Sequence, residues 1–175
     1  MQTLTCPIPN NINPLQSNGF MFGINKLPSL KYFCQEASIP SLTLPPVTQA
    51  SPFVEVPVAG DKLQFDELSI VFLIDEDMSN YQAIYEWLLG LGFPKTRQQY
   101  VDFTRSQMFN NRNNLADYSD GVLQILNNSN NAIKTVAFSD MIPTSLGSLT
   151  LSSTVDNTTY LAGQATFAYT YYEFV

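Results

Sequence analysis

The fold is decided by residues 63–89, which read LQFDELSIVFLIDEDMSNYQAIYEWLL, because the hydrophobic pattern changes its period within this stretch. In residues 63–74, one face is formed by alternate apolar residues, which predicts a strand with a buried face: Leu68, Ile70, Phe72 and Ile74. Farther along, apolar residues at helical spacing form one stripe: Tyr81, Ile84, Tyr85 and Leu88. Ser79 as the N-cap and Gly90 after the last turn predict a helix over about residues 79–89.

Short apolar segments elsewhere predict further strands. Residues 20–24 and 30–35 have the pattern of two strands joined by a turn, and later segments alternate in the same way: 121–126, 133–139, 148–152 and 164–174. The asparagine-rich residues 127–131 supply turn chemistry. Together these segments predict a mainly β fold, an antiparallel sandwich or barrel-like sheet with one flanking α-helix.

The length of the chain suits one domain with a sizeable core. Residues 1–18 are rich in proline and asparagine and are predicted to form an extended N-terminal arm. Residues 19–175 are predicted to form a single domain with a polar excursion at about residues 95–132. The start of the chain lacks the pattern of a signal peptide, and no apolar run approaches membrane-spanning length, so we expect a protein made in the cytosol without a membrane anchor.

The composition excludes several classes of protein. The 175 residues include no histidine, which rules out a Ser-His-Asp triad and imidazole metal ligands. The 15 acidic and 8 basic residues give a formal net charge of -7, which disfavours tight binding to a phosphate backbone. Charged residues make up 13% of the chain, about half of the roughly 25% that is usual for soluble domains. A polar surface with few charges is easy to bury between subunits, which favours a structural protein.

Residues 37–58 are rich in proline, which cannot donate to a sheet ladder, so they are predicted to form an edge strand or a long loop.

The chain has two cysteines, Cys6 and Cys34. We expect both to be free thiols in a reducing cytosol, although the sequence also allows a disulfide bridge between them.

Two segments carry opposite charge. Acidic residues predominate in the first: Asp61, Asp66, Glu67, Asp75, Glu76 and Asp77. Basic residues predominate in the second: Lys95, Arg97, Arg105 and Arg112. Carboxylates could bind a hard cation or hydrolyse a glycosidic bond, but those just before the predicted helix are better explained by the positive end of its dipole. Segments of opposite charge can also meet between identical subunits, in rings or filaments.

The closing aromatic segment allows two interpretations. Its side chains could stack on a sugar, as in a carbohydrate-binding or host-adhesion module with a β-sandwich fold: Tyr169, Tyr171, Tyr172 and Phe174. We favour packing in the core or against another subunit.

Four stretches, taken in order and spacing, point to a known family. They are FCQEASIP at residues 33–40, VEVPVAGD at 54–61 with the strand that follows, the helix with YEW at 85–87, and FSDMIPTSL at 138–146 with the closing strand of residues 165–174. In these stretches the chain resembles the tail tube proteins of contractile-tailed, T4-like bacteriophages, including the initiator proteins of the baseplate.

The resemblance implies a ring of six subunits around a channel, stacked into a tube that conducts DNA. The subunit would be either the repeating tube protein or the initiator ring, assembled in the host cytoplasm, with sheath and baseplate proteins as partners in the virion. The lumen is expected to be acidic and to use some of the acidic residues named above. A long hairpin would reach the neighbouring ring or subunit: Pro45, Pro46, Pro52, Val54, Glu55, Val56, Ala59, Gly60 and Asp61. No catalytic residues and no cofactor are implied.

Overall fold

The computed structural model describes residues 13–92, 96–98, 101, 118–152 and 160–175. The predicted mainly β fold is confirmed. Its elements are β1 (Phe20–Ile24), α1 (Leu30–Phe33), β2 (Cys34–Ala37), β3 (Leu42–Thr43), β4 (Val47–Gln49), β5 (Val56–Val58), β6 (Gln64–Phe65), β7 (Leu68–Leu73), α2 (Ser79–Gly92), β8 (Ser119–Leu126), β9 (Ala132–Leu146), β10 (Ala162–Ala168) and β11 (Tyr171–Phe174). Most of the predicted N-terminal arm lies outside the described residues, and its described part, residues 13–18, is exposed and contains no helix or strand.

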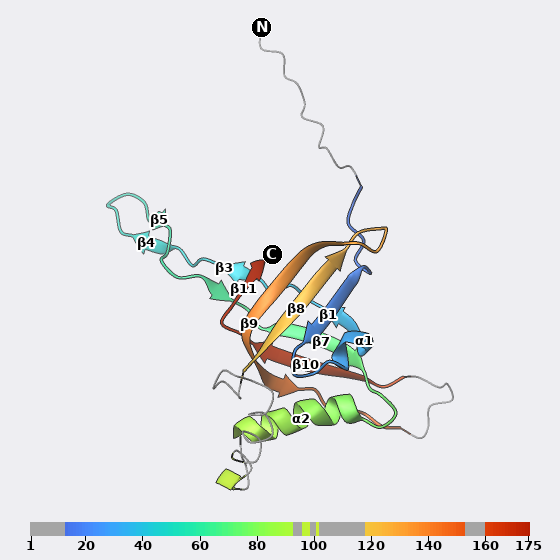
Figure 1. Ribbon diagram of the computed structural model, residues 1–175. Helices are drawn as coiled ribbons and strands as arrows, with labels where there is room; N and C mark the ends of the chain where they lie inside the picture. The colour runs from blue at the N-terminus through green and yellow to red at the C-terminus, as the bar shows by residue number, and fades with distance from the viewer. Residues whose placement is uncertain (1–12, 93–95, 99–100, 102–117, 153–159) are drawn as a thin grey trace.

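Two antiparallel sheets share the long strand β9 (Figure 1). The first half of β9 lies between β8 and β11, and β1 pairs with the far side of β8. The second half of β9 pairs with β10, which is followed by β7 and β2. Asp140 lies where β9 changes partners and has a φ of 56°, a left-handed conformation that aspartate adopts more readily than most residues. The bend lets one strand serve both sheets.

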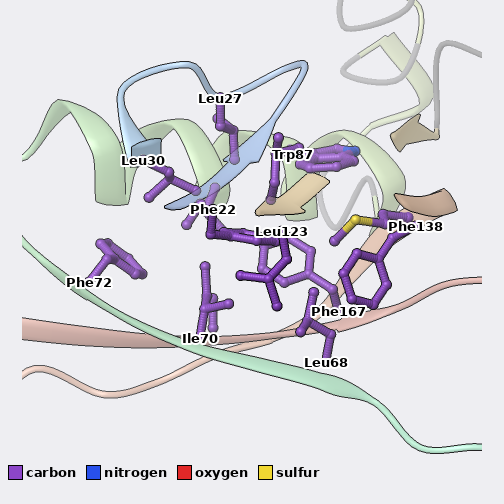
Figure 2. Close-up of a cluster of buried hydrophobic side chains, with 14 of the residues drawn as sticks. Phe22, Leu27, Leu30, Leu68, Ile70, Phe72, Trp87, Leu123, Phe138 and Phe167 are labelled. Carbon is purple, nitrogen blue, oxygen red and sulfur yellow. The ribbon is translucent and has the colours of Figure 1, made fainter. Parts of the chain in front are cut away.

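The hydrophobic core draws side chains from both sheets and from helix α2 (Figure 2). Its fully buried aromatic residues come from β1, β7, β9 and β10: Phe22, Phe72, Phe138 and Phe167. From α2, Ile84 and Trp87 are buried, and the Trp87 ring lies 6.2 Å from the Phe167 ring. Helix α2 therefore covers the sandwich on the side of β10 and the end of β9 (Figure 1).

The strand predicted at residues 63–74 is confirmed in its apolar part. Burial alternates along β7, where Leu68, Ile70 and Phe72 are fully buried. Asp66 and Glu67 interrupt the predicted strand and are exposed, because the chain enters the sheet only after them. The residues before them form the separate strand β6, which pairs with β3.

Helix α2 is confirmed, with two corrections. The helix continues to residue 92, and Gly90 is buried within it instead of following its last turn. Packing against the core outweighs the weak helix propensity of glycine at this position. The buried face includes Ile84 and Trp87, whereas Tyr85 of the predicted stripe is 50% exposed. The helix turns its largest apolar side chain inward, since that burial removes the most surface from water.

The hairpin predicted from residues 20–24 and 30–35 is wrong. Strand β1 pairs with β8, residues 30–33 form the short helix α1, and β2 pairs with β7 in the other sheet. Leu27 and Leu30 are buried in the core. Their burial makes this connection a crossing between the sheets, not a tight turn.

Strands β8 and β9 confirm the strands predicted at residues 121–126 and 133–139, although β9 is much longer than predicted. The turn between them is also confirmed. The backbone amides of Ser129 and Asn131 both donate to the side chain of Asn127 at 2.9 Å.

The strand predicted at residues 164–174 is split into two. Strand β10 ends at Ala168, a bend lies at Thr170, and β11 pairs with the first half of β9. Strict alternation over residues 164–174 would place Tyr171 on the same face as the buried Phe167, but the bend reverses the faces, so that Tyr172 packs against the core and Tyr171 is exposed. Residues 148–152, which were also predicted as a strand, are not in one.

Candidate assembly surface

A two-stranded arm projects from the sandwich in the chain between β2 and β7 (Figure 1). We define the arm as residues 42–65. Its inner ladder pairs β3 with β6, and its outer ladder pairs β4 with β5. Every residue from 41 to 59 is exposed, so the described part of the chain does not cover the arm.

The arm is rich in apolar side chains despite this exposure. Its large apolar residues have exposed fractions between 44% and 97%: Leu42, Leu44, Val47, Phe53, Val54, Val56, Val58 and Leu63. Phe53, near the tip, is 97% exposed. So many large exposed apolar side chains on one projecting segment indicate a site that another molecule covers. The sequence prediction missed Phe53, although an aromatic residue in a proline-rich segment without core partners was the available signal.

The structure brings the predicted hairpin residues together on the arm: Pro45, Pro46, Pro52, Val54, Glu55, Val56, Ala59, Gly60 and Asp61. Gly60 lies close to the backbone of Pro45 on the other side of the arm. A Cβ atom at Gly60 would lie 2.1 Å from the carbonyl oxygen of Pro45. The geometry of the arm at this point therefore requires glycine.

Outside the arm, three of the described strands have an open edge. Strands β1, β2 and β11 each pair with only one neighbouring strand. At the β11 edge, Tyr171, Phe174 and Val175 are exposed. Unpaired N–H and C=O groups along such an edge can pair with a strand of another chain.

Strand β7 separates the acidic candidates into two groups. One group precedes β7, with Asp61 in the arm and Asp66 and Glu67 between the arm and the strand. The other lies between the end of β7 and α2: Asp75, Glu76 and Asp77. A strand of 6 residues spans about 20 Å. The two groups therefore do not form one patch within a subunit.

Asp75 caps helix α2. Its carboxylate accepts hydrogen bonds from the Ser79 hydroxyl and from the Asn80 backbone amide, the second at 3.4 Å. The side-chain amide of the buried Asn80 donates to the Leu73 carbonyl at 2.7 Å. These contacts agree with a structural role for Asp75 at the helix end. In the parts of the chain that the structure describes, no cluster of three or more His, Cys, Asp and Glu side chains could hold a metal ion.

The comparison with protein families agrees with this arrangement of sandwich, helix and arm. The family model described as phage tail tube protein matches residues 3–175. The chain belongs to this family. The resemblance found in the sequence is thereby confirmed, and this tail tube protein is a structural protein of the phage tail. A comparison with curated proteins gives no match.

Several solved structures share the fold of this tail tube protein. One is in the sheath-tube complex of an extracellular contractile injection system, PVC, in the extended state, with a TM-score of 0.58 at 12% identity over 93% of this chain and 91% of that chain. The baseplate of the anti-feeding prophage gives 0.57 at 14% identity over 93% and 96%. The cap that terminates the anti-feeding prophage tube gives 0.62 at 12% identity over 99% of both chains. At these identities the likeness shows the fold alone.

Of the four basic candidates of this tail tube protein, only Arg97 lies within the described residues. Lys95, Arg105 and Arg112 lie outside the described residues, and Arg97 is exposed. The contact between acidic and basic segments of different subunits stays a prediction.

No helix that the structure describes is long and apolar enough to cross a membrane.

The four residues that could stack on a sugar have two different environments. Tyr171 and Phe174 are exposed at the β11 edge, whereas the other two are packed. Tyr169 and Tyr172 belong to an aromatic cluster with Phe65 and Phe138, with ring centroids 5.2–6.2 Å apart. Burial, with smaller contributions from the neighbouring Tyr172 and Asp66, raises the pKa of Tyr169 to about 12, so its hydroxyl remains a donor at neutral pH. This packing supports the core interpretation for both tyrosines.

Cys34 of this tail tube protein is half-buried and is a free thiol, whereas Cys6 lies outside the described residues. Burial raises the pKa of the Cys34 thiol to about 11, against the opposing effect of a hydrogen bond with the backbone of Glu36. We expect iodoacetamide to alkylate Cys34 in a Cys6→Ser variant roughly a hundredfold more slowly at pH 8 than a free cysteine, because only the thiolate reacts. The rate should rise up to about pH 11. A plateau near pH 9 would contradict this prediction.

Proposed function

We propose that six copies of this tail tube protein close into a ring and that the rings stack into a tube that conducts the phage genome. The exposed apolar arm is the observation that carries this proposal. It offers one surface of the subunit to a different surface of another copy, which is a heterologous contact. Contacts of this kind generate closed rings or open filaments, whereas a self-complementary contact stops at a dimer.

The open edges of the sheets support lateral closure of the ring. Strand β11 lies at one end of its sheet, and β2 lies at an end of the other sheet. Pairing between edge strands of neighbouring subunits would satisfy the unpaired backbone groups and bury the exposed apolar residues at β11. Six subunits joined in this way would surround a channel with a continuous β-structure.

The acidic character of the subunit supports a lumen through which DNA passes without binding. A net charge of -7 repels a polyanion. We propose that some of Asp61, Asp66, Glu67, Asp75, Glu76 and Asp77 face the channel or an adjoining ring. Sheath and baseplate proteins would be the other partners in the virion, after assembly in the host cytoplasm.

Two roles fit this ring, the repeating subunit of the tube and the initiator that joins the tube to the baseplate. The number of copies in each virion, compared with that of the sheath protein, distinguishes them. Near-equal numbers indicate the repeating subunit, and about six copies indicate a single ring.

Electron microscopy and sedimentation of the purified protein test the proposal directly. We expect hexameric rings, and tubes at high concentration or with tail partners present. A protein that stays monomeric under all of these conditions would contradict the proposal.

Phe53→Ser is expected to raise the protein concentration needed for tube formation about tenfold or more, because burying a phenylalanine contributes roughly 1.5–3 kcal/mol. The Phe53 side chain is 97% exposed, so the fold of the subunit should not change. Leu151→Ser is the matched control, because Leu151 is also exposed, at 80%, but lies outside the arm. Light scattering against concentration measures the threshold, and an equal shift in both variants would count against a specific role of the arm.

A further inference from the structure

The root of the arm is where the chain leaves and re-enters the sandwich, at Pro40 and Asp66. Two tyrosines from the C-terminal segment contact these two points, one tyrosine at each. The Tyr169 hydroxyl donates to the Asp66 carbonyl at 2.7 Å. The Tyr172 hydroxyl donates to the Pro40 carbonyl at 3.4 Å. Both chains of the arm are therefore held at the root by side chains that lie more than 100 residues farther along.

Aromatic packing reinforces these two hydrogen bonds. Phe65, on strand β6 of the arm, lies 6.1 Å from Tyr169 and 5.5 Å from Tyr172, in both cases edge to face. The same tyrosines lie 5.2 Å and 5.8 Å from Phe138, which is 1% exposed in the core. The cluster thus connects the arm to the buried core of the subunit through two tyrosine rings.

At the root, the two chains of the arm also contact each other, but farther out the described chain gives the arm no contacts comparable to those of the tyrosines. The Asp66 amide donates to the Ser41 carbonyl at 3.1 Å, and the Ser41 hydroxyl donates to the Asp66 carboxylate. Beyond this point, residues 42–59 are all exposed. An arm strand of about ten residues reaches roughly 30 Å, so a small tilt at the root displaces the tip by several ångströms.

We propose that Tyr169 and Tyr172 form a latch that fixes the direction in which the arm leaves the subunit. They are positioning residues, because they act on the arm and not on the partner that the arm contacts. Tyr172 belongs to the edge strand β11. The latch therefore links the arm to the edge at which a neighbouring strand can pair.

The test uses the full-length double variant Tyr169→Phe/Tyr172→Phe, which keeps both rings and removes both hydroxyl donors. Hydrogen exchange of the unassembled subunit, measured by mass spectrometry on peptides that cover the arm root, should accelerate about fivefold for each hydroxyl removed. Tyr171→Phe is the matched control, since Tyr171 lies next to Tyr172 but is 44% exposed. Exchange in peptides from α2 should not change in either variant.

A second measurement is the concentration threshold for tube formation, whose interpretation rests on the proposed function. The double variant should need a severalfold higher concentration than the wild type and the Tyr171→Phe control. Unchanged exchange at the arm root overturns the latch, and so does faster exchange with an unchanged threshold. If the wild type forms no tubes, the proposed function fails, and the exchange measurement alone decides whether the latch exists.

Discussion

Phe167→Ala is expected to lower the free energy of unfolding by about 3–5 kcal/mol, because it removes a large buried side chain and leaves a cavity. Phe167 is fully buried, and its ring lies 6.2 Å from that of Trp87. A loss of this size is a large part of the roughly 5–15 kcal/mol that stabilises a typical domain. Urea denaturation of the unassembled subunit, followed by tryptophan fluorescence, measures the change.

Phe53→Ala is the control for this prediction, because it makes the same chemical change at a side chain that is 97% exposed. Its free energy of unfolding should stay within about 0.5 kcal/mol of the wild type. A loss below about 1 kcal/mol for Phe167→Ala would show that the core relaxes around the missing ring. The contact between β10 and α2 would then contribute less than its geometry indicates.

Gly60→Ala is expected to abolish tube formation while leaving the sandwich folded. The added Cβ would lie 2.1 Å from the Pro45 carbonyl oxygen, so the two strands of the arm must move apart. Both residues lie outside the core, which should keep the unfolding transition of the sandwich close to that of the wild type. Electron microscopy for tubes, with urea denaturation alongside, separates the effect on assembly from the effect on stability.

Gly92→Ala provides the control for this substitution. Among the described residues beyond its own helix turn and chain neighbours, a Cβ at Gly92 would meet no atom within 4 Å, so the same chemical change adds no clash there. We expect tubes as abundant as those of the wild type. Normal tubes from Gly60→Ala would mean that assembly does not require the observed geometry of the arm.

Local patterns in the sequence predicted the elements whose signals are complete within a few residues. Alternation of apolar residues identified β7, helical spacing identified α2, and clustered asparagines identified the turn at residues 127–131. The same patterns do not specify partners across the chain. Residues 20–24 and 30–35 looked like a hairpin because they are close in sequence, yet Leu27 and Leu30 enter the core and send the chain to the other sheet.

Features that depend on tertiary contacts were beyond the reach of these patterns. The bend at Thr170 reverses the faces of the last strand, and an uninterrupted alternation of residues gave no sign of it. The hydrogen bonds from Tyr169 and Tyr172 to the arm root join residues more than 100 positions apart. The prolines of residues 37–58 predicted an edge strand or loop and the family resemblance implied a long hairpin, but only the structure shows that the described chain leaves the apolar side chains of this arm exposed.

The continuity of the arm with β7 has a mechanical consequence. Strand β6 leads through Asp66 and Glu67 into β7, which lies between β10 and β2. In antiparallel sheets the hydrogen bonds run perpendicular to the strands. Tension on the arm along the axis of β7 would therefore load the bonds on both sides of this strand together, in shear, instead of opening them one after another from an edge. A pulling force on the arm would thus pass into an interior strand of the sheet, with partners on both sides.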